Sequence, residues 1–121
     1  KDERSYVASE ISKKTEAVTV LKDARTVVAS SKNTLGYEYT VPIYTSTTGN
    51  SGMSKGGSGD VLAGIIAGIL AGSKAHDLST FEATCLAVNI HGRAGDIAKV
   101  KLGEHSMLAR DIIDGLSSIL P

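Results

Sequence analysis

The chain has 121 residues, in which 13 lysines and arginines are balanced by 13 aspartates and glutamates. This length fits one domain rather than two, and the neutral net charge gives no indication of binding to nucleic acid or to an anionic membrane. The single cysteine, Cys85, excludes an internal disulfide framework and fits a reducing compartment such as the cytoplasm. Since the chain does not begin with methionine, we interpret it as part of a longer protein.

A short amphipathic helix is predicted at residues 2–14. Its apolar side chains recur at helical spacing, and charged residues lie on the other side. We therefore expect Tyr6, Val7 and Ile11 to face the protein interior.

Three strands are predicted next. The β-branched runs AVTVL (17–21) and TVVAS (26–30) flank a polar turn at residues 22–25, which is the pattern of strand, turn, strand. After a loop, YEYTVPIY (37–44) alternates as a third strand, in which Pro42 favours an edge or a strand end.

The stretch 61–71 is apolar on all sides, which predicts a helix buried inside the protein. It is too short to cross a bilayer, which takes roughly 20 residues. Gly64, Gly68 and Gly72 recur at every fourth residue and lie near one stripe. We expect the sheet or another helix to pack closely against this stripe.

Two further helices are expected in the last third of the chain. Ser79 and Glu82 have the spacing of a capping box and would start a helix that ends at Gly103. The inner side of a last amphipathic helix would carry Leu108, Ile112, Ile113, Leu116 and Ile119. The predicted architecture is an α/β fold of about three strands and four helices, with the sheet covered on both faces.

The stretch GMSKGGSGD (52–60) sets a glycine-rich loop directly before the apolar helix. Unpaired N–H groups and the positive end of the helix dipole meet at a helix N-terminus, so this construction is typical of an anion site. The N–H groups around Gly57, Ser58 and Gly59 are candidates to surround a phosphate. The sequence contains no Gly-Lys-Ser/Thr triplet, so the loop is not a Walker A motif.

Asp60 follows in the first turn of the same helix. Beside a phosphoryl group, a carboxylate can take a proton from an attacking hydroxyl or hold a metal ion. Alternatively, Asp60 only favours the helix dipole, a contribution under about 1 kcal/mol. The combination of GGSGD with an apolar helix favours the chemical role.

Other polar residues are given structural interpretations. Metal-ligand spacing is lacking at the three histidines, His76, His91 and His105, so no metal site built from the protein alone is expected. His91 is interpreted as a packing or hydrogen-bonding residue, and Cys85 as a small core residue. Lys55 either reaches a phosphate or is solvated, and Asp96 and Asp111 are interpreted as surface or helix-packing charges.

The segment GNSGMSKGGSGDVLAGIIAGILAG (49–72) closely resembles the signature of the ADP/ATP-dependent NAD(P)H-hydrate dehydratases, a branch of the ribokinase-like superfamily. LKDART (21–26) is similar to the family's segment LKGAHT. HGRAGDIA (91–98) and LGEHSMLARDIID (102–114) resemble its C-terminal helices. The resemblance covers essentially all of residues 1–121, and it implies the C-terminal part of a single three-layer α/β/α domain.

This resemblance implies a repair reaction. ADP or ATP, with Mg²⁺, would phosphorylate the hydroxyl of hydrated NADH or NADPH, and loss of phosphate would restore the reduced nucleotide. The resemblance implies that Asp60 is the base and contacts the hydrate, and that Asn50 supports hydrate binding. The anion hole that it implies consists of Gly57, Ser58 and Gly59. The nucleotide-binding residues that it implies are Lys22, Asp23, Ala24, Arg25, Thr26 and Gly59.

The sequence departs from the family at three positions, of which the mildest is Thr48 in place of a common proline. Asp23 stands where glycine is common and Arg25 where histidine is frequent, which leaves the preference for ADP or ATP open. Without the N-terminal half of the domain, the chain alone is expected to be catalytically incomplete. A homo-oligomer of the full protein is expected from an exposed sheet edge and from the habits of the superfamily.

Two alternatives stay open at this point. One is a related kinase that phosphorylates a vitamin precursor or another alcohol, and the other is a nucleotide-binding fragment without turnover. LKDART and HGRAGD favour the dehydratase over the kinase. Asp60 argues against a purely binding role, because binding does not need a base.

Overall fold

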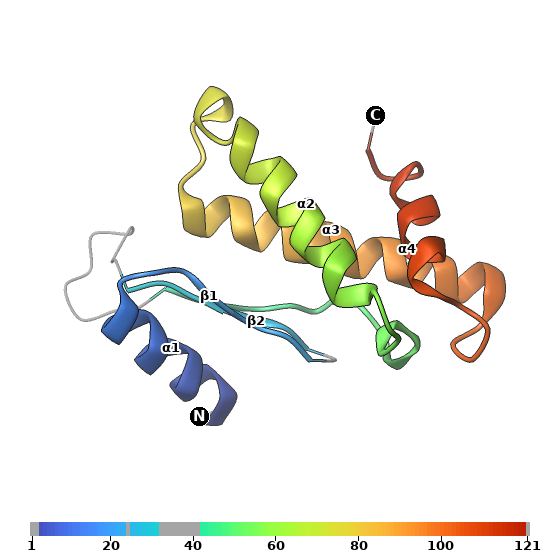
Figure 1. Cartoon of the computed structure of the whole chain (residues 1–121), viewed down its shortest axis with the longest axis horizontal. Helices are drawn as coiled ribbons and strands as arrows, with labels where there is room; N and C mark the ends of the chain where they lie inside the picture. The colour runs from blue at the N-terminus through green and yellow to red at the C-terminus, as the bar shows by residue number, and fades with distance from the viewer. Residues whose placement is uncertain (1–2, 24, 32–41, 121) are drawn as a thin grey trace.

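The computed structural model describes residues 3–23, 25–31 and 42–120 (Figure 1). The helices of this part are α1 (Glu3–Thr15), α2 (Ser58–Gly72), α3 (Thr80–Leu102) and α4 (Ala109–Leu116). The short 3-10 helices η1 (Ser51–Met53) and η2 (Lys74–His76) precede α2 and α3.

The strands β1 (Thr19–Leu21), β2 (Val27–Ala29) and β3 (Ile43–Thr45) form an antiparallel sheet in the order β1-β2-β3. The predicted strand, turn, strand at the start of the chain is therefore confirmed. Of the predicted third strand, residues 37–41 lie outside the described residues. β3 begins directly after Pro42, whose carbonyl oxygen accepts the Ser30 N–H at 3.1 Å, so the proline stands at a strand end as predicted.

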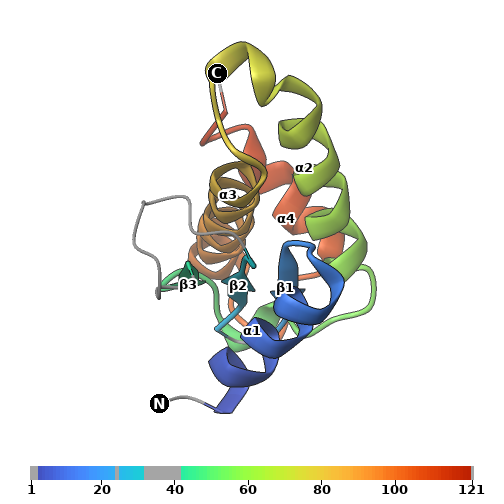
Figure 2. The same cartoon turned by 90° about the vertical axis from the view of Figure 1, so that its left-hand side faces the viewer.

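Helices cover both faces of the sheet, with α1 on one side and α2 and α3 on the other (Figure 2). Alternate residues of β2 point to opposite faces, as in any strand. Val27 and Ala29 pack against Ala8 of α1, while Val28 packs against Leu62 of α2 and Val88 of α3. The predicted α/β architecture with both faces covered is confirmed.

The buried face of α1 differs from the prediction. Tyr6 is 66% exposed, Val7 42% and Ile11 41%. The buried residues of α1 are Ala8, Ser9 and Ser12. Small side chains let the helix lie close to the sheet, where the Ser12 hydroxyl donates to the carbonyl oxygen of Ala29 at 3.0 Å. Helical spacing gave the correct element but the wrong face, because small residues make the contact.

The prediction that α2 is buried all round is wrong for the described residues. The buried residues of α2 are Ser58 and Leu62, and the helix crosses α3 with much of its surface uncovered. Within the described part of the chain, no atom lies within 4 Å of a Cβ built on Gly64, Gly68 or Gly72. The expected close packing against the glycine stripe is therefore not seen here.

The two later helices begin close to where they were predicted. In α3, Ser79 and Glu82 form the capping box, with bonds of 3.0 and 2.9 Å, and Gly103 ends the helix at a φ of 81°. In α4, Ile112 is buried, and Leu116 and Ile119 pack against the same core, but Leu108 and Ile113 are exposed. The position facing the core that the pattern missed is Met107, which is fully buried.

We expect Ser79→Ala to lower the free energy of unfolding of the complete protein by about 1 kcal/mol, because it leaves an N–H at the start of α3 without its acceptor. Urea unfolding of the variant and the wild type measures the difference. Ser118→Ala, at an exposed position beyond α4, is the control and is expected to change little. Equal stability of the Ser79 variant and the wild type would show that the capping box does not hold α3.

Candidate phosphate-binding site

A polar cavity of about 410 Å³ lies where the β1–β2 turn, the segment after β3, the start of α2 and the middle of α3 meet. Its walls are formed by Lys22, Asp23, Thr26, Ser46, Thr48, Gly49, Asn50, Met53, Ser54, Lys55, Ser58, Gly59, Leu62, Val88, His91 and Gly92. The fold thus brings the LKDART turn and the glycine-rich loop to one cavity, although residues 27–51 separate them in the sequence.

The glycine-rich loop enters α2 through Gly57, which has a φ of +90° and therefore favours glycine. The N–H of Ser58 donates to the Lys55 carbonyl oxygen at 3.2 Å, and the N–H of Val61 donates to that of Gly57 at 3.1 Å. Among the described residues, the N–H groups of Gly59 and Asp60 have no backbone acceptor. Of these two residues, only Gly59 lines the cavity, so its N–H is the donor left for an anion there. Gly57 and Asp60 do not line the cavity, and the Ser58 N–H is already bonded.

Lys22 lies directly against this helix start. A Cβ built on Gly59 would collide with the Lys22 Nζ, so only glycine leaves the ammonium group in its position. A lysine charge and the positive end of α2 therefore act at the same point, and together they favour a bound anion. Lys22 was one of the predicted nucleotide-binding residues, and the tertiary structure sets it beside the predicted anion site.

The remaining predicted nucleotide-binding residues divide into two groups. Asp23 and Thr26 line the cavity, and the Thr26 hydroxyl donates to the Asp23 carbonyl oxygen at 3.3 Å. Arg25 is exposed and is not part of the cavity wall, and Ala24 lies outside the described residues. Arg4 of α1 holds the turn by donating to the Leu21 carbonyl oxygen at 3.3 Å and by pairing with the Asp23 carboxylate at 3.5 Å.

Asp60 is exposed and does not line this cavity. It lines an open apolar groove between α2 and α4, together with Val61, Gly64, Ile65, Ile113 and Leu116. Gly59 belongs to the cavity and Asp60 to the groove, so the first turn of α2 borders both hollows.

Asn50 lines the cavity, but its side chain is already bonded at both ends. Its Oδ1 accepts the N–H of Gly52 at 3.0 Å and so caps η1, while its Nδ2 donates to Asp96 at 2.8 Å. The predicted role of Asn50 as a hydrate ligand therefore has to compete with two structural hydrogen bonds.

The segment HGRAGD (91–96) of α3 packs against the glycine-rich loop and the residues just before it. The sequence interpretation missed this contact. Gly92 leaves room for Thr48, and Gly95 leaves room for Met53, where a Cβ would collide in each case. Asp96 accepts from the loop backbone and from Asn50. The signal was the small residue at every third or fourth position of α3, which marks a close approach of another backbone.

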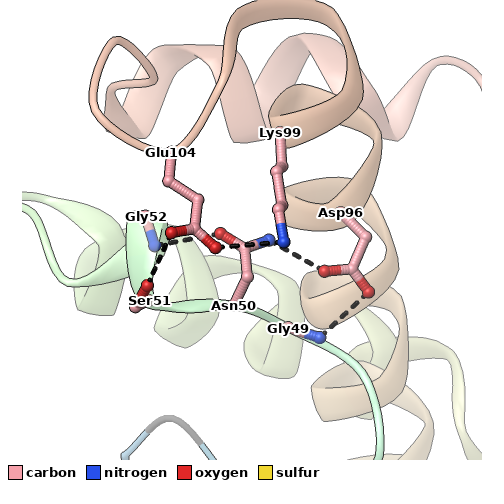
Figure 3. Close-up of polar contacts among 7 residues, drawn as sticks. All are labelled: Gly49, Asn50, Ser51, Gly52, Asp96, Lys99 and Glu104. Atoms are coloured by element: carbon pink, nitrogen blue, oxygen red, sulfur yellow. Dashed lines mark hydrogen bonds and ion pairs between the residues drawn. The ribbon is translucent and has the colours of Figure 1, made fainter.

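Lys55 lines the cavity, and its ammonium group is bonded to the main chain. Its Nζ donates to the carbonyl oxygens of Glu104, His105 and Met107 at 3.5, 3.4 and 2.9 Å. It therefore ties the glycine-rich loop to the α3–α4 connection and is not a solvated lysine. Glu104 adds to this tie by accepting from the Ser51 hydroxyl at 3.0 Å and by pairing with Lys99 at 3.0 Å (Figure 3).

His91 makes a hydrogen bond, as the sequence predicted, but it does so inside the cavity. Its Nε2 lies 3.1 Å from the carbonyl oxygen of Ser58, the first residue of α2. Burial lowers the pKa of His91 below its ordinary value of 6.5, and the nearby charge of Lys22 also lowers this pKa, although the bond to Ser58 opposes the shift. The imidazole is therefore neutral at pH 7, and its Nε2–H donates to Ser58.

The lowered pKa of His91 makes stability depend on pH. Below pH 6.5 the unfolded chain binds a proton at His91 before the folded chain does, so folding becomes less favourable as the pH falls through this window. We expect His91→Gln, which keeps a donor near the same position, to lose less stability on acidification than the wild type. Urea unfolding at neutral and mildly acidic pH measures this, and equal losses in the two proteins would contradict the role given to burial of His91.

The meeting of a glycine-rich loop, a helix N-terminus and a lysine at one cavity of an α/β domain is typical of phosphate-binding domains. A protein-family model described as NAD(P)H-hydrate dehydratase matches residues 1–118. The chain therefore belongs to the NAD(P)H-hydrate dehydratase family, as the sequence resemblance predicted.

Individual relatives agree with the family. The bifunctional NAD(P)H-hydrate repair enzyme Nnr of Moorella thermoacetica is 40% identical over 119 residues, which is 98% of this chain and 20% of that protein. The ADP-dependent (S)-NAD(P)H-hydrate dehydratase of Neisseria meningitidis is 39% identical over 87 residues, which is 72% of this chain and 25% of that protein.

A solved structure also matches. It is the ADP/ATP-dependent NAD(P)H-hydrate dehydratase of Bacillus subtilis co-crystallised with ATP/Mg²⁺, which is 28% identical with a TM-score of 0.82. The match covers 97% of this chain and 38% of that one, so the chain spans well under half the length of the relatives it matches. Within residues 3–23, 25–31 and 42–120, no helix is both long and apolar enough to cross a membrane.

Proposed function

We propose that the complete protein restores NADH or NADPH from its hydrate in a nucleotide-dependent dehydration, and that this chain is the C-terminal part of its single ribokinase-like domain. The observation that carries the proposal is the first turn of α2, where the Lys22 ammonium lies against Gly59 in the cavity wall and Asp60 is the next residue of the helix. The names of the Neisseria and Bacillus relatives, an ADP-dependent and an ADP/ATP-dependent dehydratase, support the same reaction.

In this reaction, the nucleotide phosphates would bind at Gly59 and Lys22, with Asp23 and Thr26 on the adjacent wall of the cavity. The hydrate would lie toward the segment after β3, which carries Asn50 and Met53. Met53 packs against the same apolar cluster as Val61, the residue after Asp60, which supports placing the hydrate on this wall.

The chemistry follows from this arrangement. Asp60 takes the proton of the hydrate hydroxyl. The hydroxyl oxygen of the hydrate forms a bond to the terminal phosphorus of the nucleotide, while the bond from that phosphorus to the bridging oxygen breaks and the shortened nucleotide leaves. The N–H groups at the start of α2 and the Lys22 ammonium stabilise the charge on the transferring group. The phosphorylated intermediate then loses phosphate from one ring carbon and a proton from the next, which restores the double bond.

Mg²⁺ would enter with the nucleotide phosphates and neutralise part of their charge. This ion is usually held by one or two carboxylates together with substrate phosphates. Asp23 is a carboxylate on the cavity wall and fits that requirement. Within the described residues, no cluster of three or more acidic, histidine or cysteine side chains could hold the ion without a nucleotide.

The test uses the complete gene product, incubated with NADH hydrate, Mg²⁺ and either ADP or ATP, while the absorbance of the reduced nicotinamide is followed. Recovery that requires the nucleotide would support the proposal and identify the phosphoryl donor. Absence of recovery in a folded protein that binds nucleotide would reject the dehydratase and favour the related kinase. Nucleotide binding without any phosphoryl transfer to alcohols would favour a non-catalytic protein.

A further inference from the structure

One carboxylate of α3 holds the loop of residues 49–52, of which Gly49 and Asn50 line the cavity. Asp96 accepts the N–H of Gly49 on Oδ2 at 3.1 Å and the Asn50 Nδ2 on Oδ1 at 2.8 Å (Figure 3). The other end of the Asn50 amide accepts the N–H of Gly52 at 3.0 Å. Three hydrogen bonds therefore fix the loop through two side chains, Asp96 and Asn50.

This pair determines the direction of the loop. Gly49 has a φ of +106°, a conformation that favours glycine. It lies outside any helix or strand, so no regular secondary structure fixes this conformation. Asp96 is half-buried in the middle of α3, a rigid helix of 23 residues whose N-terminus is capped. A carboxylate that receives two donors fixes both the backbone at Gly49 and the plane of the Asn50 amide, which an apolar contact does not do.

We propose that Asp96 is a positioning residue for hydrate binding, and that Asn50 serves this purpose through its bonds to Asp96 and Gly52 instead of through contact with the hydrate. The inference rests on the proposed function, and it deepens that function by naming the residue that sets the hydrate side of the cavity. The opposite wall, which carries Lys22 and Thr26, makes no hydrogen bond to Asp96 among the described residues.

The chain offers an exchange of the two side chains as a test. In Asp96→Asn, an amide NH₂ meets either the Gly49 N–H or the Asn50 NH₂, so one donor loses its acceptor. In Asn50→Asp, two carboxylates face each other at hydrogen-bond distance. In the double variant Asn50→Asp/Asp96→Asn, the carboxylate at position 50 accepts from Gly52 and from the new amide, whose oxygen accepts from Gly49. All three bonds can form again.

We expect each single variant to raise the KM for the hydrate by roughly 10- to 100-fold, the effect of losing one charge-assisted hydrogen bond. The nucleotide Kd should stay within about twofold of the wild type, because the nucleotide wall is not touched. The double variant should recover most of the KM. Asp114→Asn, an exposed carboxylate on α4, is the control and should leave every value unchanged.

A second measurement does not depend on activity. Amide hydrogen exchange at residues 49–52 should become faster in both single variants and slow again in the double variant. Unchanged exchange and KM in the single variants, or a double variant no better than either single one, would overturn the inference. Equal losses of hydrate and nucleotide affinity would also overturn it, since they would indicate general destabilisation. Absence of hydrate recovery in the wild type would reject the proposed function, while the exchange pattern would still report on the loop.

Discussion

Asp60→Asn in the complete protein is expected to lower turnover by about 10²- to 10⁴-fold, the usual contribution of a positioned general base. The asparagine keeps the size of the side chain and its place beside the groove, but it cannot accept the hydroxyl proton. Because Asp60 does not line the polar cavity, nucleotide binding should remain nearly unchanged. The loss should therefore fall on kcat and not on the nucleotide affinity.

The measurement is the rate of nucleotide-dependent NADH recovery at saturating substrate, together with nucleotide binding by calorimetry. Asp77→Asn is a matched control, since Asp77 is exposed and has a φ of 57°, a conformation that asparagine also tolerates. A turnover close to that of the wild type would remove Asp60 from the role of base. Loss of nucleotide binding would instead mean that the carboxylate supports the cavity.

The second large effect is expected at Gly92. A Cβ at this position would collide with the Thr48 Oγ1 and lie 2.8 Å from the Thr48 carbonyl carbon, and the backbone cannot yield as a flexible side chain would. Gly92→Ala should therefore lower the free energy of unfolding by about 1–3 kcal/mol, the usual cost of overpacking. It should also weaken ligand binding, because Thr48 and Gly49 belong to the cavity wall.

Gly68→Ala is the matched control, since it makes the same chemical change in α2, where no described atom lies within 4 Å of the new Cβ. This variant should be more stable than the wild type by about 0.5–1 kcal/mol, because alanine favours a helix over glycine. Urea unfolding of both variants measures the contrast. Similar stability changes in the two variants would contradict the role of Gly92. A loss of stability in Gly68→Ala but not in Gly92→Ala would show that the complete protein covers this face of α2.

The sequence by itself determined the elements whose signals are local. The capping residues Ser79 and Glu82 define the start of α3, and Gly103 defines its end, because these residues bond to backbone groups within a few positions. The loop GGSGD predicted an anion site at the start of α2, since the unpaired N–H groups of a helix start are a property of the helix alone. The segments 21–26, 49–72, 91–98 and 102–114 were sufficient to predict the family.

The buried faces of α1 and α2 were decided only by the tertiary structure. Apolar residues such as Val7 and Ile11 are exposed, while Ala8 and Ser12 are buried, because the contact with the sheet depends on how closely two backbones approach. A hydrophobic pattern records which residues prefer to leave water, but it does not record which partner covers them.

The candidate site was determined partly by local sequence and partly by the tertiary structure. Local sequence marked Gly59 and Asp60, but it could not predict that Lys22 lies against Gly59 or that His91 bonds to Ser58. It also could not predict that the side chain of Asn50 donates a hydrogen bond to Asp96. Each of these contacts joins residues more than 30 positions apart, and only the packing of α2 and α3 against the sheet brings them within reach.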